Sequence, residues 1–600
     1  MKRFLALILF GLSCAGLWSV PARHGKILAT QPDGTTIEVE ISGDETFHYT
    51  ATTDGYLVKR NSEGFFEYAT ITNGEIVTSG IRVYNQDMKA NTNIEAFSIE
   101  RQLEMLNSTW TQRAAAKRQA QQTNATENGL ADEGIVILVN FQDVKFTVEN
   151  PQAAFDSLLN QEGYSENGAL GSARDYFYAS SAGQYDPTFH IYGPYDLPHD
   201  MEYYGANNYT GDKHPEQMIV DAVKKLYADT TANINLSDYD QNGDGLIDFV
   251  FVYYAGHNEA EGGPENSIWP HKSQINDNPA ISEADRNIEY DGKKLGMYAC
   301  TSELRGAGGN EMCGVGTFCH EFGHVLGLMD LYSTNYNGHK TLGTWDIMDQ
   351  GAYNNDGKTP PLYSAFERFV LGWLTPEVIK ADTSYVLENI GTSNKTFIIR
   401  SDGGTTLPNW NTTNKYYLLE TRVNEIDNTW DEYLPGQGMI ITQIAYSQRK
   451  WMMNTINDDE DNMGVDLIEA DGRTDYMIDG KKGDAFPGLM NVTGFNAYDR
   501  FWLSGITFDE DASTVSFKVK GTSVGVENVF ENQGEIFIAG STVYGLEAGM
   551  KLRCIDMSGR TLWSDVALSD TYTFDMPQGL YCIIVSQDGM QRKVLKSVGK

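Results

Sequence analysis

The chain has 600 residues, of which 82 are Asp or Glu and 45 are Lys or Arg, so its formal net charge at pH 7 is -37. A single hydrophobic core stops growing at a few hundred residues, so several domains are expected. Nucleic acid is excluded as a partner because acidic surface repels phosphate, and a hydrophobic content of 41% excludes a largely disordered chain.

The first 22 residues are predicted to be a secretory signal peptide. Lys2 and Arg3 precede an apolar run from Phe4 to about Leu17, and small residues follow up to Ala22. The run is too short to span a bilayer, and no later stretch has the roughly 20 apolar residues of a transmembrane helix. We therefore expect a protein that is secreted, extracellular or attached to the outer cell surface.

Two further segments precede the main body of the chain. Residues 23–100 alternate short strand patterns with turns, which predicts a small β-rich domain. Residues 101–130 are polar and rich in Ala, Gln, Asn and Thr, with Arg113, Lys117 and Arg118 among them. This segment is predicted to be a linker in which a protease cuts during maturation.

Residues 131–376 are predicted to form a mixed α/β domain. Ile135–Val139 and Phe249–Tyr254 have the apolar composition of buried strands, and the helical patterns cover 151–160, 171–180, 214–228 and Gly314–Leu328. Strand patterns then dominate residues 377–522, which predicts a β-sandwich domain. Residues 523–600 contain further short strands and are expected to form a separate β module.

Residues 238–248 place oxygen-bearing side chains at every second position around two glycines. A tight loop of that kind suits Ca²⁺, which prefers oxygen ligands. The predicted ligands of a structural calcium site are Asp238, Asp240, Asn242, Asp244 and Asp248. A solvated turn is the alternative, and for the acidic run 457–462 it is the preferred interpretation.

The segment 320–330 contains the pattern His-Glu-x-x-His within a helical stretch. Histidines four residues apart share one face of a helix, so His320 and His324 can bind one metal ion. Gly327 lets the chain turn back, so that Asp330 can be the third ligand. Three protein ligands leave one position open, which is typical of a catalytic zinc rather than a structural one.

Glu321 is predicted to be the general base of an amide hydrolysis. It lies one position after the first histidine, where it can accept a proton from a water on the metal and pass it to the leaving amine. Tyr353 is a candidate for binding the oxyanion that develops in the transition state. His257 and His271 can line the cleft, although a structural or surface role is the preferred interpretation for both.

These motifs resemble the immune inhibitor A type of metallopeptidases, family M6, which belongs with the metzincins. The resemblance covers about 130–520 and implies zinc on His320, His324 and Asp330. Metzincins place a methionine turn below the metal, and Gly343–Asp349 is similar to it, with Met348 as the floor. The stretches 416–422 and 434–438 resemble the β domain that follows the peptidase unit in that family.

The resemblance also implies that the N-terminal β domain is a propeptide. A cysteine that blocks the zinc is not available, since Cys14 lies in the predicted signal peptide and the next cysteine is Cys300. Latency must then depend on another ligand or on steric blockage.

The cysteines that remain after the predicted signal peptide are odd in number. Cys554 with Cys582 is the first candidate disulfide pair, and Cys300 with Cys313 is the second.

The C-terminal residues 523–600 resemble the sorting domains of type IX secretion, and an ordinary accessory β domain is the alternative.

The sequence as a whole predicts an α+β multidomain protein. A metzincin-like zinc peptidase domain, with a mixed sheet and an active-site helix, is expected between a β-rich prodomain and C-terminal β-sandwich domains. The expected function is a secreted zinc endopeptidase made as a zymogen, acting on proteins or peptides and exported through a secretion machinery. A catalytically inactive cell-surface binding protein is the competing hypothesis.

Overall fold

The computed structural model describes residues 20–44, 48–72, 75–83, 94–99, 101–102, 132–208, 211–334, 339–472, 482–498, 500–521, 536–539, 542–556, 560–574, 579–587 and 590–599. The chain divides into two compact units, of which the first comprises residues 1–497 and 503–520 and the second residues 498–502 and 521–600. Most of the predicted signal peptide and nearly all of the predicted linker lie outside the described residues.

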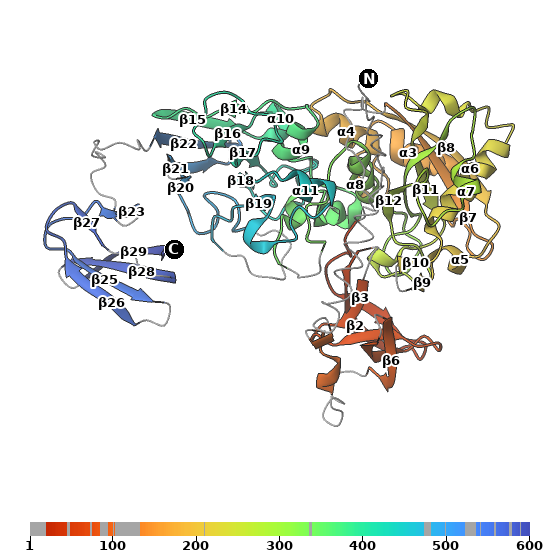
Figure 1. Ribbon diagram of the computed structural model, residues 1–600, viewed down its shortest axis with the longest axis horizontal. Coiled ribbons are helices and arrows are strands. Elements are labelled where there is room, and N and C mark those ends of the chain that lie inside the picture. The colour runs from red at the N-terminus through yellow and green to blue at the C-terminus, as the bar shows by residue number, and fades with distance from the viewer. Residues whose placement is uncertain are drawn as a thin grey trace, which may run out of the picture. The chain divides into compact units, whose positions relative to one another are not determined.

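The N-terminal part of the first unit is a six-stranded antiparallel sheet in which each strand pairs with the next along the chain (Figure 1). Its strands are β1 (Ile27–Thr30), β2 (Thr36–Gly43), β3 (His48–Thr52), β4 (Leu57–Arg60), β5 (Phe66–Thr72) and β6 (Glu75–Arg82), and the 3₁₀ turn η2 (Ile94–Phe97) follows. Val39, Val58 and Tyr68 are among the buried residues of its own small core. The predicted β-rich character of this segment is confirmed.

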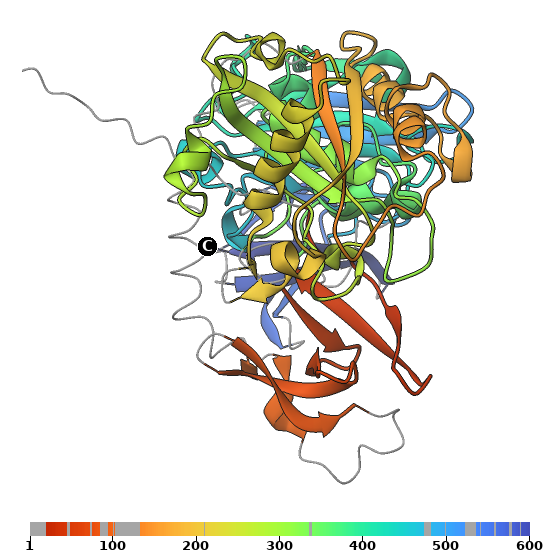
Figure 2. The ribbon, with the colours of Figure 1, turned by 90° about the vertical axis from the view of Figure 1, so that its right-hand side faces the viewer.

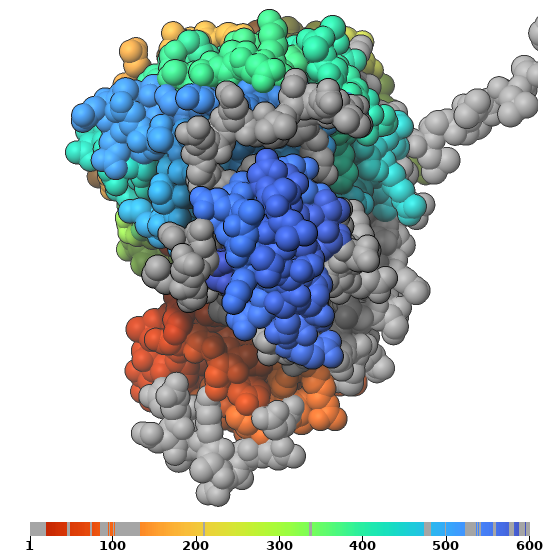
Figure 3. All heavy atoms as spheres, turned by 90° about the vertical axis from the view of Figure 1, so that its left-hand side faces the viewer, coloured from red at the N-terminus to blue at the C-terminus, as the bar shows by residue number. Residues whose placement is uncertain are grey.

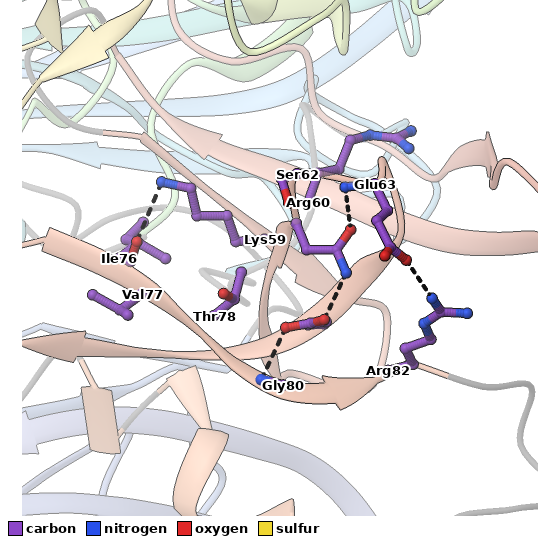
Figure 4. Close-up of a pocket in the computed structure, with 11 residues that line it drawn as sticks. Lys59, Arg60, Ser62, Glu63, Ile76, Val77, Thr78, Gly80 and Arg82 are labelled. Carbon is purple, nitrogen blue, oxygen red and sulfur yellow. Dashed lines mark hydrogen bonds and ion pairs between the residues drawn. The ribbon is translucent and has the colours of Figure 1, made fainter.

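A shallow pocket lies on this sheet between β4, β5 and β6, and its lining is polar (Figure 4). Its charged groups already have partners within the sheet. Arg82 Nη2 lies 2.8 Å from Glu63 Oε2, and Glu67 accepts hydrogen bonds from Asn61 Nδ2 at 2.6 Å and from the Gly80 N–H at 2.9 Å. Lys59 and Arg60 also line the pocket, and each donates to a backbone carbonyl, of Ile76 and Gly64 respectively.

A five-stranded sheet with the order β12-β13-β11-β7-β8 forms the centre of the unit. The strands are β7 (Glu133–Asn140), β8 (Thr188–Asp196), β11 (Leu246–Tyr254), β12 (His271–Gln274) and β13 (Lys294–Ser302). All neighbours are parallel except β12, which runs antiparallel to β13 at the edge.

Successive side chains of β7 and β11 point to opposite faces of this sheet. Ile137 and Val252 belong to the core under α6 (Pro215–Ala228), which crosses one face (Figure 2). Leu138 and Phe251 belong to the core on the other face, together with side chains from α3 (Pro151–Asn160), α4 (Ala173–Ser180) and α8 (Gly316–Val325). Both faces are covered by helices, which explains why these strands are apolar throughout.

Short elements connect these parts. They are η3 (Glu166–Gly168), α5 (Met201–Gly205), β9 (Asn207–Asn208), β10 (Gly211–Asp212), η4 (Leu236–Tyr239), η5 (Glu259–Glu261), α7 (Glu283–Arg286), η6 (Gly343–Trp345), η7 (Gln350–Gly357) and α9 (Ala365–Val370). Among the helices that the structure describes, none combines the length and the apolar composition needed to cross a bilayer.

Residues 377–520 contain two sheets, with the orders β14-β16-β17-β18-β19 and β15-β22-β21-β20. Their elements are β14 (Glu377–Val378), β15 (Thr383–Glu388), α10 (Ile390–Ser393), β16 (Phe397–Arg400), β17 (Tyr416–Arg422), β18 (Gly438–Ile444), α11 (Gln448–Met452), η8 (Glu460–Asn462), β19 (Val465–Leu467), β20 (Gly494–Ala497), β21 (Phe501–Asp509) and β22 (Thr514–Gly521). The rings of Tyr385, Phe397 and Phe517 join the two sheets. Tyr416 and Trp451 also belong to the same core as α8, so this region and the central sheet share one hydrophobic interior.

The second unit contains a three-stranded and a four-stranded antiparallel sheet, whose described side chains form one compact body (Figure 3). The strands are β23 (Phe537–Ala539), β24 (Thr542–Tyr544), β25 (Lys551–Asp556), β26 (Thr561–Val566), β27 (Thr571–Thr573), β28 (Gly579–Gln587) and β29 (Met590–Gly599). Leu552, Ile583 and Val585 are buried in its core.

The cysteine pairs suggested by the sequence are not formed, and all five cysteines of the described residues are free thiols. Cys554 is opposite Ile583 in the sheet, and Cys582 is the residue before Ile583, so the two sulfurs point to opposite faces. Cys300 and Cys313 belong to the two cores on opposite sides of the central sheet. Both suggested pairings were wrong, because the strand register separates Cys554 from Cys582 and the central sheet separates Cys300 from Cys313.

Candidate active site

Helix α8 carries His320 and His324 on the side opposite to Phe318 and Phe322. Phe318 and Phe322 anchor the opposite side of the helix against Phe189 at ring-centroid distances of 4.9 and 5.3 Å. His320 and His324 are four residues apart and both are buried. The aromatic anchor therefore fixes the rotation of the helix and with it the direction of the two imidazoles.

Three possible metal-ligand atoms meet at one point above this helix. Asp330 Oδ1 lies 3.2 Å from Nε2 of His320 and 3.2 Å from Nε2 of His324. The other ring nitrogens are held by backbone oxygens, with His320 Nδ1 2.7 Å from Ile347 O and His324 Nδ1 3.0 Å from Leu328 O. These contacts leave both Nε2 atoms for a metal, as is usual for histidine ligands. The donor set suits zinc.

The turn after α8 brings Asp330 to this point. The helix ends at Val325, earlier than the predicted Leu328, and Gly327 adopts a φ of 100°, a left-handed conformation that favours glycine. The chain then reverses, and the amide of Asn454 holds both the backbone N–H and Oδ2 of Asp330.

Met348, the predicted floor of the methionine turn, packs closely against α8. A Cβ atom added at Gly323 would come within 2.9 Å of Met348 Sδ, so the glycine allows the turn to approach α8 closely. The Met348 N–H donates to Asp346 Oδ1 at 2.8 Å, and Met348 O accepts from the Leu331 N–H at 2.9 Å. The turn is thus tied to the segment that carries Asp330.

Glu321 is fully buried and faces the extreme N-terminal residues described in the structure. Its Oε1 accepts a hydrogen bond from the backbone N–H of Val20 at 3.0 Å. We call residues 20–24 the N-terminal segment. Its backbone is held by three further side chains: Trp269 Nε1 donates to Val20 O at 3.0 Å, Tyr353 OH to Pro21 O at 2.8 Å, and Gln350 Nε2 to Ala22 O at 3.1 Å.

Burial and charge act in opposite directions at this site. Burial alone would raise the pKa of Asp330, but the two neighbouring imidazoles outweigh it and hold that pKa well below its usual value. Burial lowers the pKa of His324, which favours the neutral imidazole that a metal requires. On β12, burial lowers the pKa of Lys272 to about 8, against the attraction of Glu321 and Asp330.

The other two histidines considered from the sequence have structural contacts. His271 is buried, with Nδ1 2.8 Å from Trp269 O and Nε2 2.9 Å from Tyr298 OH. His257 Nε2 lies 3.1 Å from Gly309 O. These contacts support the structural interpretation that the sequence preferred.

In the acidic loop, the structure groups three of the five predicted calcium ligands. Asp240, Asp244 and Asp248 each place a carboxylate oxygen within 4.8 Å of the others. Asn242 lies beside this group and donates from Nδ2 to Asp248 Oδ1 at 2.7 Å. Asp238 instead accepts a hydrogen bond from Asn235 at 2.8 Å.

Several residues of the site were missed by the sequence analysis. Trp269, Lys272, Gln350 and Asn454 contact or face the active-site groups, yet each is far from the zinc motif in the chain. No local pattern marks them, since a tryptophan, lysine or amide is unremarkable without its neighbours. Residues 20–22 lie within the predicted signal peptide, and their backbone groups are hydrogen-bonded to Glu321, Tyr353 and Gln350.

Two imidazoles, a carboxylate and a separate buried glutamate define a zinc metallopeptidase type of site. Residues 120–371 match the family model described as "Immune inhibitor A peptidase M6, catalytic domain". The chain is 27% identical over 303 residues to immune inhibitor A of Bacillus thuringiensis subsp. alesti, with 43% of each chain covered. It is 26% identical over 276 residues to the pre-pro-metalloprotease PrtV of Vibrio cholerae serotype O1, with 40% of this chain and 29% of the relative covered.

The chain thus spans less than half the length of these curated relatives. Residues 120–371 are thus similar to the catalytic domain of M6 peptidases.

Proposed function

We propose that this protein is a secreted, metzincin-like zinc endopeptidase, made as a zymogen, which hydrolyses peptide bonds in proteins. The observation that carries the proposal is the convergence of His320, His324 and Asp330 beside Glu321, which contributes no atom to the group. Zinc bound there would polarise the scissile carbonyl and lower the pKa of the attacking water. The match to the M6 catalytic-domain model and the similarity to a relative named as a metalloprotease support the same reaction.

Glu321, Tyr353 and Met348 have separate roles in the proposed reaction. Glu321 takes the proton of the attacking water and delivers it to the leaving amine. Tyr353 is positioned to stabilise the oxyanion, and its hydroxyl already donates to a peptide carbonyl, that of Pro21. Met348 packs below the histidine helix and helps to fix the geometry of the ligands.

The experiment that tests the activity is casein cleavage by the purified, matured protein. Cleavage is expected, together with its loss on treatment with a zinc chelator and its return on addition of Zn²⁺. Cleavage that resists complete zinc removal would contradict the proposal. A folded protein with stoichiometric zinc that fails to cut in every processed form would instead support the binding-protein hypothesis.

The zymogen part of the proposal is supported by the N-terminal segment. Val20 and Ala22 are buried with Ile41 of the N-terminal sheet and Trp269 of the catalytic domain. We propose that the Val20 N–H, which donates to Glu321, keeps the base occupied and blocks the approach of a substrate. Latency of this kind would be steric blockage, one of the two forms that the sequence left open. We therefore place the end of the signal peptide before Val20.

Limited proteolysis tests this latency. Cleavage within residues 101–130, which include the basic residues Arg113, Lys117 and Arg118 outside the described part of the chain, should release the N-terminal domain and raise casein cleavage. Substitution of the three basic residues by glutamine should delay maturation. Full activity of the uncut protein would contradict the zymogen proposal.

We also propose a structural calcium ion in the loop 238–248. The Asp240 side chain is fully buried, and its Oδ1 has no hydrogen-bond partner among the described residues. Burial raises the pKa of Asp248, and the charges of Asp244 and Asp240 raise it further. A bound cation would supply a partner for the buried Asp240 oxygen and would offset the repulsion among the carboxylates. The ligands that we propose are Asp240, Asp244 and Asp248 with Asn242 beside them, and Asp238 as a fifth.

For residues 523–600 we propose a sorting module that engages the type IX secretion machinery. Its support is the resemblance noted above and the separation of these residues as a compact unit of their own. Deletion of the module should leave the catalytic site intact and prevent release of the protein from the cell. Normal export of the shortened protein would favour an accessory β domain.

A further inference from the structure

We propose that Asn454 is a positioning residue for Asp330, and that the zinc site is completed by a region outside the matched peptidase domain. The match ends at residue 371, whereas Asn454 follows α11 in the β-rich region. This inference rests on the zinc site proposed above. It extends that proposal by making residues 377–520 part of the catalytic machinery.

Asn454 grips Asp330 with both ends of its side-chain amide. Its Oδ1 accepts from the Asp330 backbone N–H at 3.0 Å, and its Nδ2 donates to Asp330 Oδ2 at 2.5 Å. The backbone N–H can only donate, so it determines which end of the amide is the oxygen. The NH₂ group is thereby left facing the carboxylate, in a charge-assisted hydrogen bond.

The two carboxylate oxygens of Asp330 therefore have different partners. Oδ1 is directed at the two imidazoles, and Oδ2 is directed at the amide of Asn454. Asp330 is only 1% exposed, so solvent water cannot easily replace the hydrogen bond from the amide. Without the Asn454 side chain, the buried Oδ2 of Asp330 would lose this donor. The carboxylate could then rotate, and Oδ1 would no longer be directed at the two imidazoles.

The backbone at this position explains the choice of residue. Asn454 has a φ of 49°, and glycine is the least strained residue in the left-handed region. Asparagine tolerates that conformation and adds an amide. The substitution Asn454→Gly would therefore remove the amide while leaving the backbone conformation favourable.

Neighbouring contacts hold the segment around Asp330 independently of Asn454. Asn457 Nδ2 donates to Leu331 O at 2.7 Å, and the Thr334 N–H donates to Asp458 Oδ1 at 2.7 Å. The loss of the Asn454 amide should therefore disturb the orientation of one carboxylate rather than unfold the loop.

The test compares Asn454→Gly with Asn428→Gly in the full-length protein. Asn428 is exposed in the same region and has a φ of 58°, so its substitution is matched in backbone and side chain but lies outside the site. Zinc affinity is measured by chelator competition, the metal geometry by the absorption spectrum of the Co²⁺ form, and the fold by thermal unfolding of the metal-free proteins.

Asn454→Gly is expected to weaken zinc binding by about 10–100-fold and to change the Co²⁺ spectrum, as for other residues that orient metal ligands. Asn428→Gly should bind both metals like the wild type. Unchanged affinity and spectrum in Asn454→Gly would overturn the inference and leave the proposed function intact. A wild-type protein that binds no zinc would instead overturn the proposed function.

If Asn454→Gly does not fold, Asn454→Asp replaces it. This variant keeps the shape of the side chain but presents a carboxylate to Asp330, so a loss of zinc affinity larger than 10-fold is expected. Zinc binding equal to the wild type in this variant would also overturn the inference.

Discussion

The two groups of possible metal ligands described in the first unit differ in how they are held together. The loop cluster takes Asp240, Asp244 and Asp248 from nine consecutive residues. The active-site cluster takes its carboxylate from a turn after α8, and that carboxylate is held by an amide 124 positions away in the chain. A local cluster can form with its own loop, whereas the active-site cluster needs the packing of two regions.

The clusters also differ in charge. Two imidazoles surround Asp330 and lower its pKa, whereas Asp248 has carboxylate neighbours that raise its pKa. In the loop, Lys293 contacts Asp240 and is the cation nearest to the cluster in the described structure. The active-site carboxylate thus lies between two imidazoles, whereas the loop brings carboxylates together.

The largest expected effect separates chemistry from metal binding within the active site. Glu321→Ala should lower kcat for peptide cleavage by about 10²–10⁴-fold, because the general base is lost. Zinc content should stay at the wild-type level, since Glu321 is outside the ligand group. Glu283→Ala on the exposed helix α7 is the matched control. Retained turnover in Glu321→Ala would refute the role of this residue.

Tyr353→Phe should have the next largest effect. Loss of the hydroxyl is expected to lower kcat of the matured enzyme by about 10²-fold, with a smaller change in KM, if Tyr353 binds the oxyanion. The same change removes the hydrogen bond that the Tyr353 hydroxyl donates to Pro21 O, so the N-terminal segment should also be held less tightly in the uncut protein. Tyr433→Phe, at an exposed tyrosine, serves as the control. Equal kcat in Tyr353→Phe and the wild type would remove Tyr353 from the mechanism.

Asp466 in β19 is a second test of how neighbouring charge controls the pKa of a carboxylate. Unlike Asp330, it has no imidazole among the groups that shift its pKa. Burial, and then the charge of Glu469, raises its pKa to about 7. The folded state thus holds the proton more tightly than the unfolded chain. The stabilisation that this provides is complete below about pH 4 and is lost as the pH rises through 7.

Asp466→Asn should therefore stabilise the protein at pH 8, by roughly 2–4 kcal/mol, and have little effect at pH 4. Chemical denaturation at both pH values measures this difference. The control, Asp427→Asn, changes an exposed carboxylate. A stabilisation that is the same at both pH values would show that ionisation is not its cause.

The smallest expected effect concerns the loop cluster. Ca²⁺ at about 100 times its Kd should raise the apparent Tm by about 5 °C through its preference for the folded loop. Asp244→Ala should abolish this shift and leave the kcat of casein cleavage unchanged. An equal shift in the variant and the wild type would place the calcium elsewhere.

Much of the secondary structure was predictable because it depends on local patterns. The helix predicted at 151–160 is α3, and the one predicted at 214–228 is α6 at Pro215–Ala228. The strand predicted at Phe249–Tyr254 is the end of β11. The helix of the zinc motif was predicted too long, since the turn at Gly327 begins after Val325.

The sequence alone determined the residue types of the metal group, because helical spacing places His320 and His324 on one face and a glycine permits the turn to Asp330. Only the tertiary structure showed that Val20 lies on Glu321 and that Asn454 holds Asp330. Those contacts join residues 301 and 124 positions apart. Hydrogen bonds of this kind follow from the packing of whole regions, so no local pattern in the chain encodes them.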